Sequence, residues 1–203
     1  YHPVKHITTG EGGAILTNNH EIYEKVKCLR THGITKNRLN NKNVGPWYYE
    51  MSETGYNYRI TDFQCALGSS QLKKLDRFVE RRREIARIFD KAFSPFDFIK
   101  IPESNSSVEH SYHLYPLQID FVKTDVIKSE LFKKMKEFDI NLQVHYIPVH
   151  LQPFYQRNYG FKSGDFPISE NFYHQELSLP IYPGLSNDQI SMVVNRILEN
   201  ISS

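Results

Sequence analysis

The chain has 203 residues, of which 39% are hydrophobic and 13% aromatic, a composition too apolar for a disordered protein and a length sufficient for one or two domains. The 25 basic and 23 acidic residues leave a net charge of +2, which does not favour electrostatic binding to nucleic acid or to a membrane surface. No apolar run approaches the ~20 residues of a membrane helix, the opening residues show no signal-peptide pattern, and the two cysteines lack a CxxC spacing. We therefore expect a cytoplasmic protein with free thiols and with no nucleic-acid or membrane partner.

The first quarter of the chain predicts a turn, a short strand, a helix and a loop. Glycines gather at residues 10–13, and the apolar residues 14–17 are typical of a short strand. Asn19 is a suitable N-cap for a helix that ends near Gly33. The polar, asparagine-rich residues 34–56 predict a long loop, of a length usually linked to function or mobility. The helix capped by Asn19 would have one apolar face, formed by Ile22, Tyr23, Val26 and Leu29.

A capping box predicts a long helix in the middle of the chain. Thr61 stands at the N-cap position and Gln64 follows three residues later, the pattern in which each side chain bonds the backbone of the other residue. Apolar residues at helical spacing continue to Phe89. The Pro- and Ser-containing residues 94–111 then predict a connection, and we expect a domain boundary near residue 100.

Strands and helices alternate in the second half of the chain. We expect a strand at residues 113–119, where Pro116 favours a sheet edge or a bulge, and a second strand at 142–146. A loop should follow at residues 148–167. This alternation indicates a small α/β layer. The predicted helices span residues 125–138, 169–177 and, after a second capping box at Ser186 and Gln189, the C-terminal residues.

Lys5 is the first candidate for chemistry, although a lone lysine is usually a surface residue. Pro3 stiffens the backbone before it, and the glycines of residues 10–13 allow a tight turn and a close approach by a bulky group. A desolvated lysine amine can condense with a carbonyl compound such as pyridoxal phosphate. The spacing alone is equally compatible with a plain turn before a strand. It does not follow the P-loop order, so binding of a nucleoside triphosphate is disfavoured.

The segment before the capped helix is a candidate phosphate site. Residues 55–59 read Gly-Tyr-Asn-Tyr-Arg and directly precede the predicted N-terminus of that helix. The amide of Asn57 and the guanidinium of Arg59 would add donors to the positive end of the helix dipole. An ordinary loop with Asn57 in a turn is the alternative.

Two histidines near the end of the predicted strand at residues 142–146 form the third candidate. His145 and His150 stand five residues apart, with Tyr146 between them. No Cys or Glu in the window completes a metal-ligand set, so a polar pocket wall is favoured over a zinc site and we predict no metal. The sequence also shows no Ser-His-Asp order or carboxylate pair that would predict a hydrolase.

Taken together, these motifs resemble one family. His-Pro-Val-Lys at residues 2–5, Thr-Thr-Gly-Glu-Gly-Gly-Ala at 8–14 and Arg-Thr-His-Gly at 30–33 resemble the DegT/StrS sugar aminotransferases, pyridoxal-phosphate enzymes with the aspartate aminotransferase fold. The resemblance covers essentially the whole chain, but only the second half of a family member. The His-Pro-Val-Lys block is most similar to the pseudaminic-acid branch. Later blocks that match the family lie at residues 55–59, 66–72, 142–146 and 177–180.

The resemblance implies an α/β fold of the fold type I class. Residues 1–100 would form the end of the large cofactor-binding domain with its connecting helix, and residues 101–203 the small C-terminal α/β domain. The first half of a family member supplies the phosphate loop, an aromatic that stacks on the cofactor ring and the Asp that pairs with the ring nitrogen. We therefore expect this chain to be a piece that is inactive alone, with its first strand and helix lacking sheet neighbours.

The resemblance also assigns roles to particular residues. Lys5 would bind pyridoxal phosphate covalently and, once released, move the proton during transamination. Asn57 would reach across a homodimer interface to the phosphate of the neighbouring cofactor, so that the active site is shared. The remaining contacts, Arg59, His145 and Tyr146, would hold a nucleotide sugar.

The implied reaction is amination at C4 of a UDP-linked 4-keto-6-deoxy-N-acetylamino sugar, with glutamate as the expected amino donor. Dehydratases of the same family carry histidine in place of this lysine, so Lys5 favours transamination. A sugar dehydratase and a non-catalytic binding or regulatory protein that keeps the fold are the two alternatives.

Overall fold

The computed structural model describes residues 1–36, 39–41, 44–105 and 107–201. It divides the chain into two compact units, Tyr1–Lys74 and Leu75–Ser203, rather than near residue 100. The reason lies in the helix that starts at Leu75, because its apolar face is buried in the core of the second unit. The two units are described separately below.

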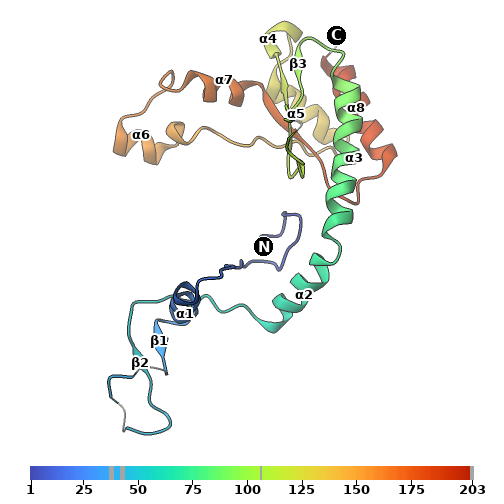
Figure 1. The fold of residues 1–203 in the computed structure, drawn as a ribbon. Coiled ribbons are helices and arrows are strands. Elements are labelled where there is room, and N and C mark those ends of the chain that lie inside the picture. The colour runs from blue at the N-terminus through green and yellow to red at the C-terminus, as the bar shows by residue number, and fades with distance from the viewer. Residues whose placement is uncertain (37–38, 42–43, 106, 202–203) are drawn as a thin grey trace. The chain divides into compact units, whose positions relative to one another are not determined.

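The described part of the first unit contains two helices and a small hairpin (Figure 1). The predicted N-cap is confirmed, because the side chain of Asn19 accepts hydrogen bonds from the backbone N–H groups of Glu21 and Ile22. The loop expected at residues 34–56 contains two paired strands, with Ile34 opposite Met51. The elements are α1 (His20–Leu29), β1 (Ile34–Thr35), β2 (Glu50–Met51) and α2 (Asp62–Leu72). Within that loop, residues 37–38 and 42–43 lie outside the described residues.

The strand predicted at residues 14–17 is absent from the structure. Ile15 and Leu16 have exposed fractions of 67% and 93%, and the backbone there is irregular. An extended segment becomes a strand only when a neighbour pairs with its backbone, and the described part of the first unit offers no such partner to this segment. The expectation that this region would lack sheet neighbours is consistent with this finding.

The long helix predicted after Thr61 is two helices. The capping box is confirmed, since the Gln64 N–H bonds the Thr61 hydroxyl and the Gln64 side chain accepts from the Thr61 N–H. The first helix, α2, ends at Leu72, and α3 (Leu75–Phe93) follows after a two-residue turn. No residue of α2 is buried, whereas α3 has an apolar face whose residues are buried. The two helices therefore do not share one continuous packing face.

The second unit is built on an antiparallel sheet of three strands in the order β3-β4-β5. The prediction that Pro116 marks an edge or a bulge is wrong for the strand as a whole, because β4 is central. Proline is tolerated because β3 pairs only with Gln118 and Ile119, which leaves Pro116 opposite β5 alone. The second predicted strand is reduced to one bridge between Gln143 and Ser178. The strands are β3 (Ile99–Lys100), β4 (Tyr115–Ile119) and β5 (Glu176–Leu179).

Helices cover this sheet and close its core. Figure 1 shows α3 running beside α8, and the two helices are in contact. The predicted capping box at Ser186 and Gln189 is confirmed. Besides α3, the helices are α4 (Phe121–Thr124), α5 (Lys128–Glu137), the 3-10 helix η1 (Val149–Leu151), α6 (Pro153–Tyr159), α7 (Pro167–Gln175) and α8 (Asn187–Ile201).

Three predicted boundaries in this unit change. The helix expected at residues 125–138 starts only at Lys128, the loop expected at 148–167 holds η1 and α6, and α7 begins at Pro167 rather than after Ser169. Proline at the first position of α6 and α7 starts each helix because its missing N–H has no intrahelical partner there. None of the helices in the described part of the chain is long and apolar enough to cross a membrane.

Candidate active site

Lys5 lies in a turn that closes on the first residue of the chain. The backbone N–H of Lys5 donates to the carbonyl of His2 at 3.1 Å, and the N–H of Thr9 donates to the carbonyl of Tyr1, also at 3.1 Å. The hydroxyl of Thr8 donates to the same Tyr1 carbonyl at 3.0 Å. These bonds hold the segment in a compact loop, and Lys5 is exposed on it.

The glycine cluster packs on α2 instead of leading into a strand. Thr9 is buried. Its Cγ2 atom packs so close to Gly68 of α2 that a Cβ added to this glycine would lie only 2.9 Å away. Gly12 has a φ of +134°, a conformation that favours glycine, and the Nε2 of Gln64 donates to the carbonyl of Glu11 at 3.2 Å. The loop that carries Lys5 is therefore held against α2 by contacts at Gln64 and Gly68.

Two glycines explain why the motifs at residues 30–33 and 55–59 occur together. A Cβ on Gly33, whose φ is +69°, would lie 1.8 Å from the carbonyl oxygen of Glu53. A Cβ on Gly55 would lie 2.1 Å from the backbone nitrogen of Gly33. The two segments cross where only glycine fits, so the spacing of both motifs reflects one close backbone contact.

The crossing positions Asn57 and Arg59. Asn57 forms an isolated antiparallel bridge with Thr31, and both Asn57 and Arg59 are exposed. Nη1 of Arg59 lies 3.1 Å from Nε2 of His32, which has a φ of +60°. Because the guanidinium can only donate, this ring nitrogen accepts the hydrogen bond and the proton of the neutral ring is on Nδ1. His32 thus orients Arg59.

A cavity of about 850 Å³ lies within the first unit. It is bounded by the glycine cluster, α1 and residues 56–64, and its lining is largely apolar. Arg59 is part of this lining; among the described residues that form it, neither Lys5 nor Asn57 is included. Arg59 and the glycine cluster therefore line the same cavity. Lys5 and Asn57 are exposed and lie outside this lining.

His145 and Tyr146 lie in the second unit, just after Gln143, which forms its bridge with Ser178 of β5. Nδ1 of His145 is 2.8 Å from the hydroxyl of Ser178, and the backbone N–H of His145 donates to Glu176 at 3.0 Å. The Ser178 hydroxyl donates to the other oxygen of Glu176 at 2.6 Å. Tyr146 is exposed, with its ring edge-on to His145 at 4.6 Å.

Glu176 and Ser178, both of which are buried, were not among the candidate residues predicted from the sequence. A signal was present, since the two polar residues are separated by one position in the apolar run Glu-Leu-Ser-Leu. Residues at this spacing in a strand lie on the same face. Polar residues on one face of a buried strand require hydrogen-bond partners, and here the partner is His145.

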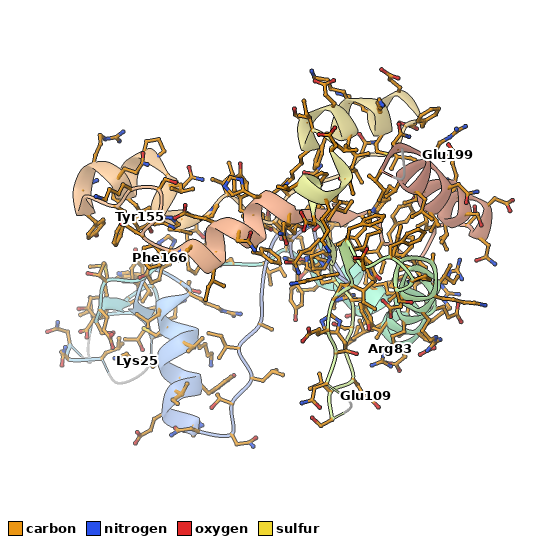
Figure 2. The ribbon with its side chains drawn as sticks, turned by 90° about the horizontal axis from the view of Figure 1, so that it is seen from above. Lys25, Arg83, Glu109, Tyr155, Phe166 and Glu199 are labelled. Atoms are coloured by element: carbon orange, nitrogen blue, oxygen red, sulfur yellow. The ribbon has the colours of Figure 1, made fainter. Side chains whose placement is uncertain are left out.

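His150 has a different environment from His145, although both were predicted to line one pocket wall. His150 is buried, and its Nε2 lies 2.9 Å from Glu170, another buried residue. The ring of Phe166, labelled in Figure 2, lies 4.6 Å from the ring of His150. His150 therefore holds the segment before α7 and is not exposed to a ligand.

The family to which the chain belongs follows from its match to a known family. Residues 1–198 match the DegT/DnrJ/EryC1/StrS aminotransferase family. The chain belongs to this family. Its α/β fold is accordingly that of the fold type I enzymes, as the motifs implied.

Two relatives of the chain come from Methanocaldococcus jannaschii and Campylobacter jejuni. An uncharacterized protein of Methanocaldococcus jannaschii is 41% identical over 203 residues, which is 100% of this chain and 53% of that protein. The UDP-4-amino-4,6-dideoxy-N-acetyl-beta-L-altrosamine transaminase of Campylobacter jejuni is 44% identical over 185 residues, or 90% of this chain and 46% of the transaminase.

Among solved structures, that of Helicobacter pylori PseC, an aminotransferase of pseudaminic acid biosynthesis, matches with a TM-score of 0.84 and 30% identity. The match covers 97% of this chain and 50% of PseC. The chain thus spans about half the length of the curated relatives it matches.

The residues present fit the pyridoxal phosphate that this aminotransferase family uses. Lys5 offers an exposed amine on a fastened loop, which is the group that condenses with an aldehyde. Asn57 offers an exposed amide donor, which suits a phosphate oxygen. Both assignments remain predictions from the motifs.

Proposed function

We propose that the complete protein, of which this chain forms a part, transfers an amino group to a nucleotide-linked keto-deoxy sugar. The observation that carries the proposal is the Lys5 loop, since its motif resembles that of the family and its residues Thr9 and Glu11 contact α2. Lysine rather than histidine at this position favours transamination over dehydration. We place the enzyme in the cytoplasm.

Lys5 performs the proton transfers of this proposed reaction. Its ε-amine holds the cofactor and, once released, takes a proton from the Cα atom of the amino-acid donor. The same amine later delivers a proton to the sugar carbon that receives nitrogen. Pyridoxal phosphate, when bound, would supply the electron-withdrawing ring that lowers the cost of removing the Cα proton.

Three side chains bind the substrate, and a fourth binds the cofactor of a neighbouring subunit. Arg59, oriented by His32, pairs with a phosphate of the nucleotide. His145 and Tyr146 contact the sugar or the base. Asn57 donates to the cofactor phosphate across a homodimer interface.

The name of the Campylobacter jejuni relative supports a specific substrate. At 44% identity, this relative is described as a transaminase of UDP-4-amino-4,6-dideoxy-N-acetyl-beta-L-altrosamine. We propose that the acceptor is the corresponding UDP-4-keto-6-deoxy-N-acetylamino sugar and that glutamate is the donor. The reaction would serve the synthesis of amino sugars for surface glycans.

Reductive labelling tests the role of Lys5. The complete protein is incubated with pyridoxal phosphate, reduced with borohydride, digested and mapped by mass spectrometry. We expect the cofactor on the peptide that contains Lys5 and its loss in Lys5→Arg, because arginine stays protonated and cannot condense with the aldehyde.

The matched control is Lys25→Arg, an exposed lysine paired with Glu53 in the same unit, which should be labelled as in the wild type. Labelling at another lysine in the wild type, or full turnover by Lys5→Arg, would overturn the assignment. The product of the wild-type reaction should carry a new amine, whereas loss of a hydroxyl would show the dehydratase alternative.

A further inference from the structure

A chain of hydrogen bonds joins Glu176 and Ser178 of the buried strand β5 to the ring of His145. We call this chain the relay. Glu176 has an exposed fraction of 0% and Ser178 of 3%. A carboxylate can only accept hydrogen bonds, so the Ser178 hydroxyl, 2.6 Å from Glu176, must donate its one proton there. The backbone N–H of His145 donates to the second oxygen of the same carboxylate at 3.0 Å.

The direction of the relay determines the tautomer of His145. Since the Ser178 proton is committed to Glu176, the Ser178 oxygen can only accept the hydrogen bond from Nδ1, 2.8 Å away. The neutral ring therefore carries its proton on Nδ1 and a lone pair on Nε2. Within the described residues, Nε2 has no hydrogen-bond partner, and the ring is partly exposed.

Lys128 places a positive charge near the buried carboxylate of Glu176. Burial lowers the pKa of Lys128, and the negative charge of Glu176 counteracts this effect by favouring the ammonium. The same ammonium donates to the carbonyl of Tyr173 at 2.6 Å, which fixes its position in the unit.

We propose that Glu176 and Ser178 are positioning residues that present Nε2 of His145 as a hydrogen-bond acceptor to the nucleotide-sugar substrate. The proposal rests on the proposed function for the identity of the ligand. It adds that the substrate places a donor group, a sugar hydroxyl or an N–H, against this nitrogen. An acceptor group of the substrate would instead require the opposite tautomer.

The substitution Glu176→Gln reverses the relay with almost no change of shape. The amide oxygen takes the place of the oxygen that accepts from the His145 backbone, and the amide NH₂ then faces Ser178 and donates to it. Ser178 must now donate to Nδ1 of His145, and the ring proton moves to Nε2. The acceptor presented to the substrate becomes a donor.

Nitrogen NMR on the complete protein tests this directly, with histidine labelled by ¹⁵N and the pH high enough to keep the rings neutral. His150 is an internal reference, because its bond to the Glu170 carboxylate requires a proton on Nε2. We expect His145 with the proton on Nδ1 in the wild type and on Nε2 in Glu176→Gln. Glu170→Gln is the matched control and should change only the His150 signals.

A wild-type His145 protonated on Nε2 overturns the relay, and this measurement needs no variant to fold. Ser178→Ala is a second variant, which removes the relay without reversing it and should leave His145 as a mixture of the two tautomers. An unchanged, pure Nδ1 tautomer in Ser178→Ala would also overturn the proposal.

Steady-state kinetics test the role of the relay in binding. Glu176→Gln should raise the KM for the nucleotide sugar about tenfold, the effect of one reversed hydrogen bond, and leave kcat and the KM for the amino donor within about twofold. Glu130→Gln, in an exposed ion pair with Lys133, is the control. A tautomer that reverses without a change in this KM would overturn the role at the substrate, whereas absence of transamination in the wild type would refute the proposed function alone.

Discussion

Glu170 shows how much of the loop before α7 depends on one carboxylate. It accepts hydrogen bonds from the backbone N–H of Gly164 at 2.9 Å, from the Ser163 hydroxyl at 3.0 Å and from His150 at 2.9 Å. The bond from the Gly164 backbone, followed by that from His150, lowers the pKa of Glu170 from 4.5 to about 2. A carboxylate in such an environment stabilises the fold only while it is ionised.

The pH dependence of stability follows from this direction of shift. Because the pKa of Glu170 falls from 4.5 when unfolded to about 2 when folded, its contribution is complete above pH 4.5 and is lost as the pH falls towards 2. Glu170→Gln should lower the melting temperature at pH 7, and the difference from the wild type should shrink at low pH. Melting curves between pH 3 and pH 7 check this, with Glu130→Gln as the exposed control; a difference that is the same at every pH would contradict it.

At the scale of elements, the first unit depends on the crossing of two segments. The bonds from Tyr56 to the Leu29 carbonyl at 2.7 Å and from Tyr58 to the Arg30 carbonyl at 2.9 Å join the end of α1 to the segment before α2. Within the residues that the structure describes, neither segment is part of a larger sheet. The glycines at the crossing are therefore structural, although they belong to the motifs that resemble the family's functional blocks.

Gly55→Ala tests this role, since its Cβ would lie 2.1 Å from the Gly33 nitrogen and 2.5 Å from the His32 carbonyl carbon. Both are backbone atoms, so the segments must separate, and we expect a loss of about 2 kcal/mol or more in the free energy of unfolding. Gly13→Ala is the matched control, because its Cβ would meet no atom within 4 Å. Urea denaturation of the complete protein measures both, and equal stabilities of the two variants would contradict the prediction.

At the scale of the whole molecule, the proposed assignment of Asn57 requires two subunits for each active site. Lys5 would then act in its own subunit and Asn57 in the neighbouring one. Both side chains are exposed in the first unit, which leaves them accessible to a cofactor and to a partner chain. This arrangement makes a prediction that a monomeric enzyme cannot satisfy.

Mixing two inactive variants tests the shared site. In a dimer of one Lys5→Ala and one Asn57→Ala subunit, one site loses both residues and the other keeps both. Random mixing should therefore restore about a quarter of the wild-type activity, half of the dimers being mixed and each having one intact site. Activity assayed at limiting pyridoxal phosphate checks this, with each variant alone as control, and recovery no greater than their sum would contradict a shared site.

The sequence by itself determined the features that depend on neighbours within a few residues or on a family motif. The caps at Asn19, Thr61 and Ser186 were predictable because their hydrogen bonds reach only two or three residues along the chain. The family and its α/β fold followed from the motif that includes Lys5. Caps and motif spacings depend only on which residues stand at neighbouring positions, so the sequence is sufficient to predict them.

Only the tertiary structure decided what depends on distant segments. The bond between His145 and Ser178 joins residues 33 apart, and the buried position of His150 depends on Glu170, 20 residues later. The division after Lys74 likewise depends on how α3 packs with α8 and the sheet. Helical periodicity records that a face is apolar but not which surface will cover it, so the partner of each buried group is established only when the chain folds.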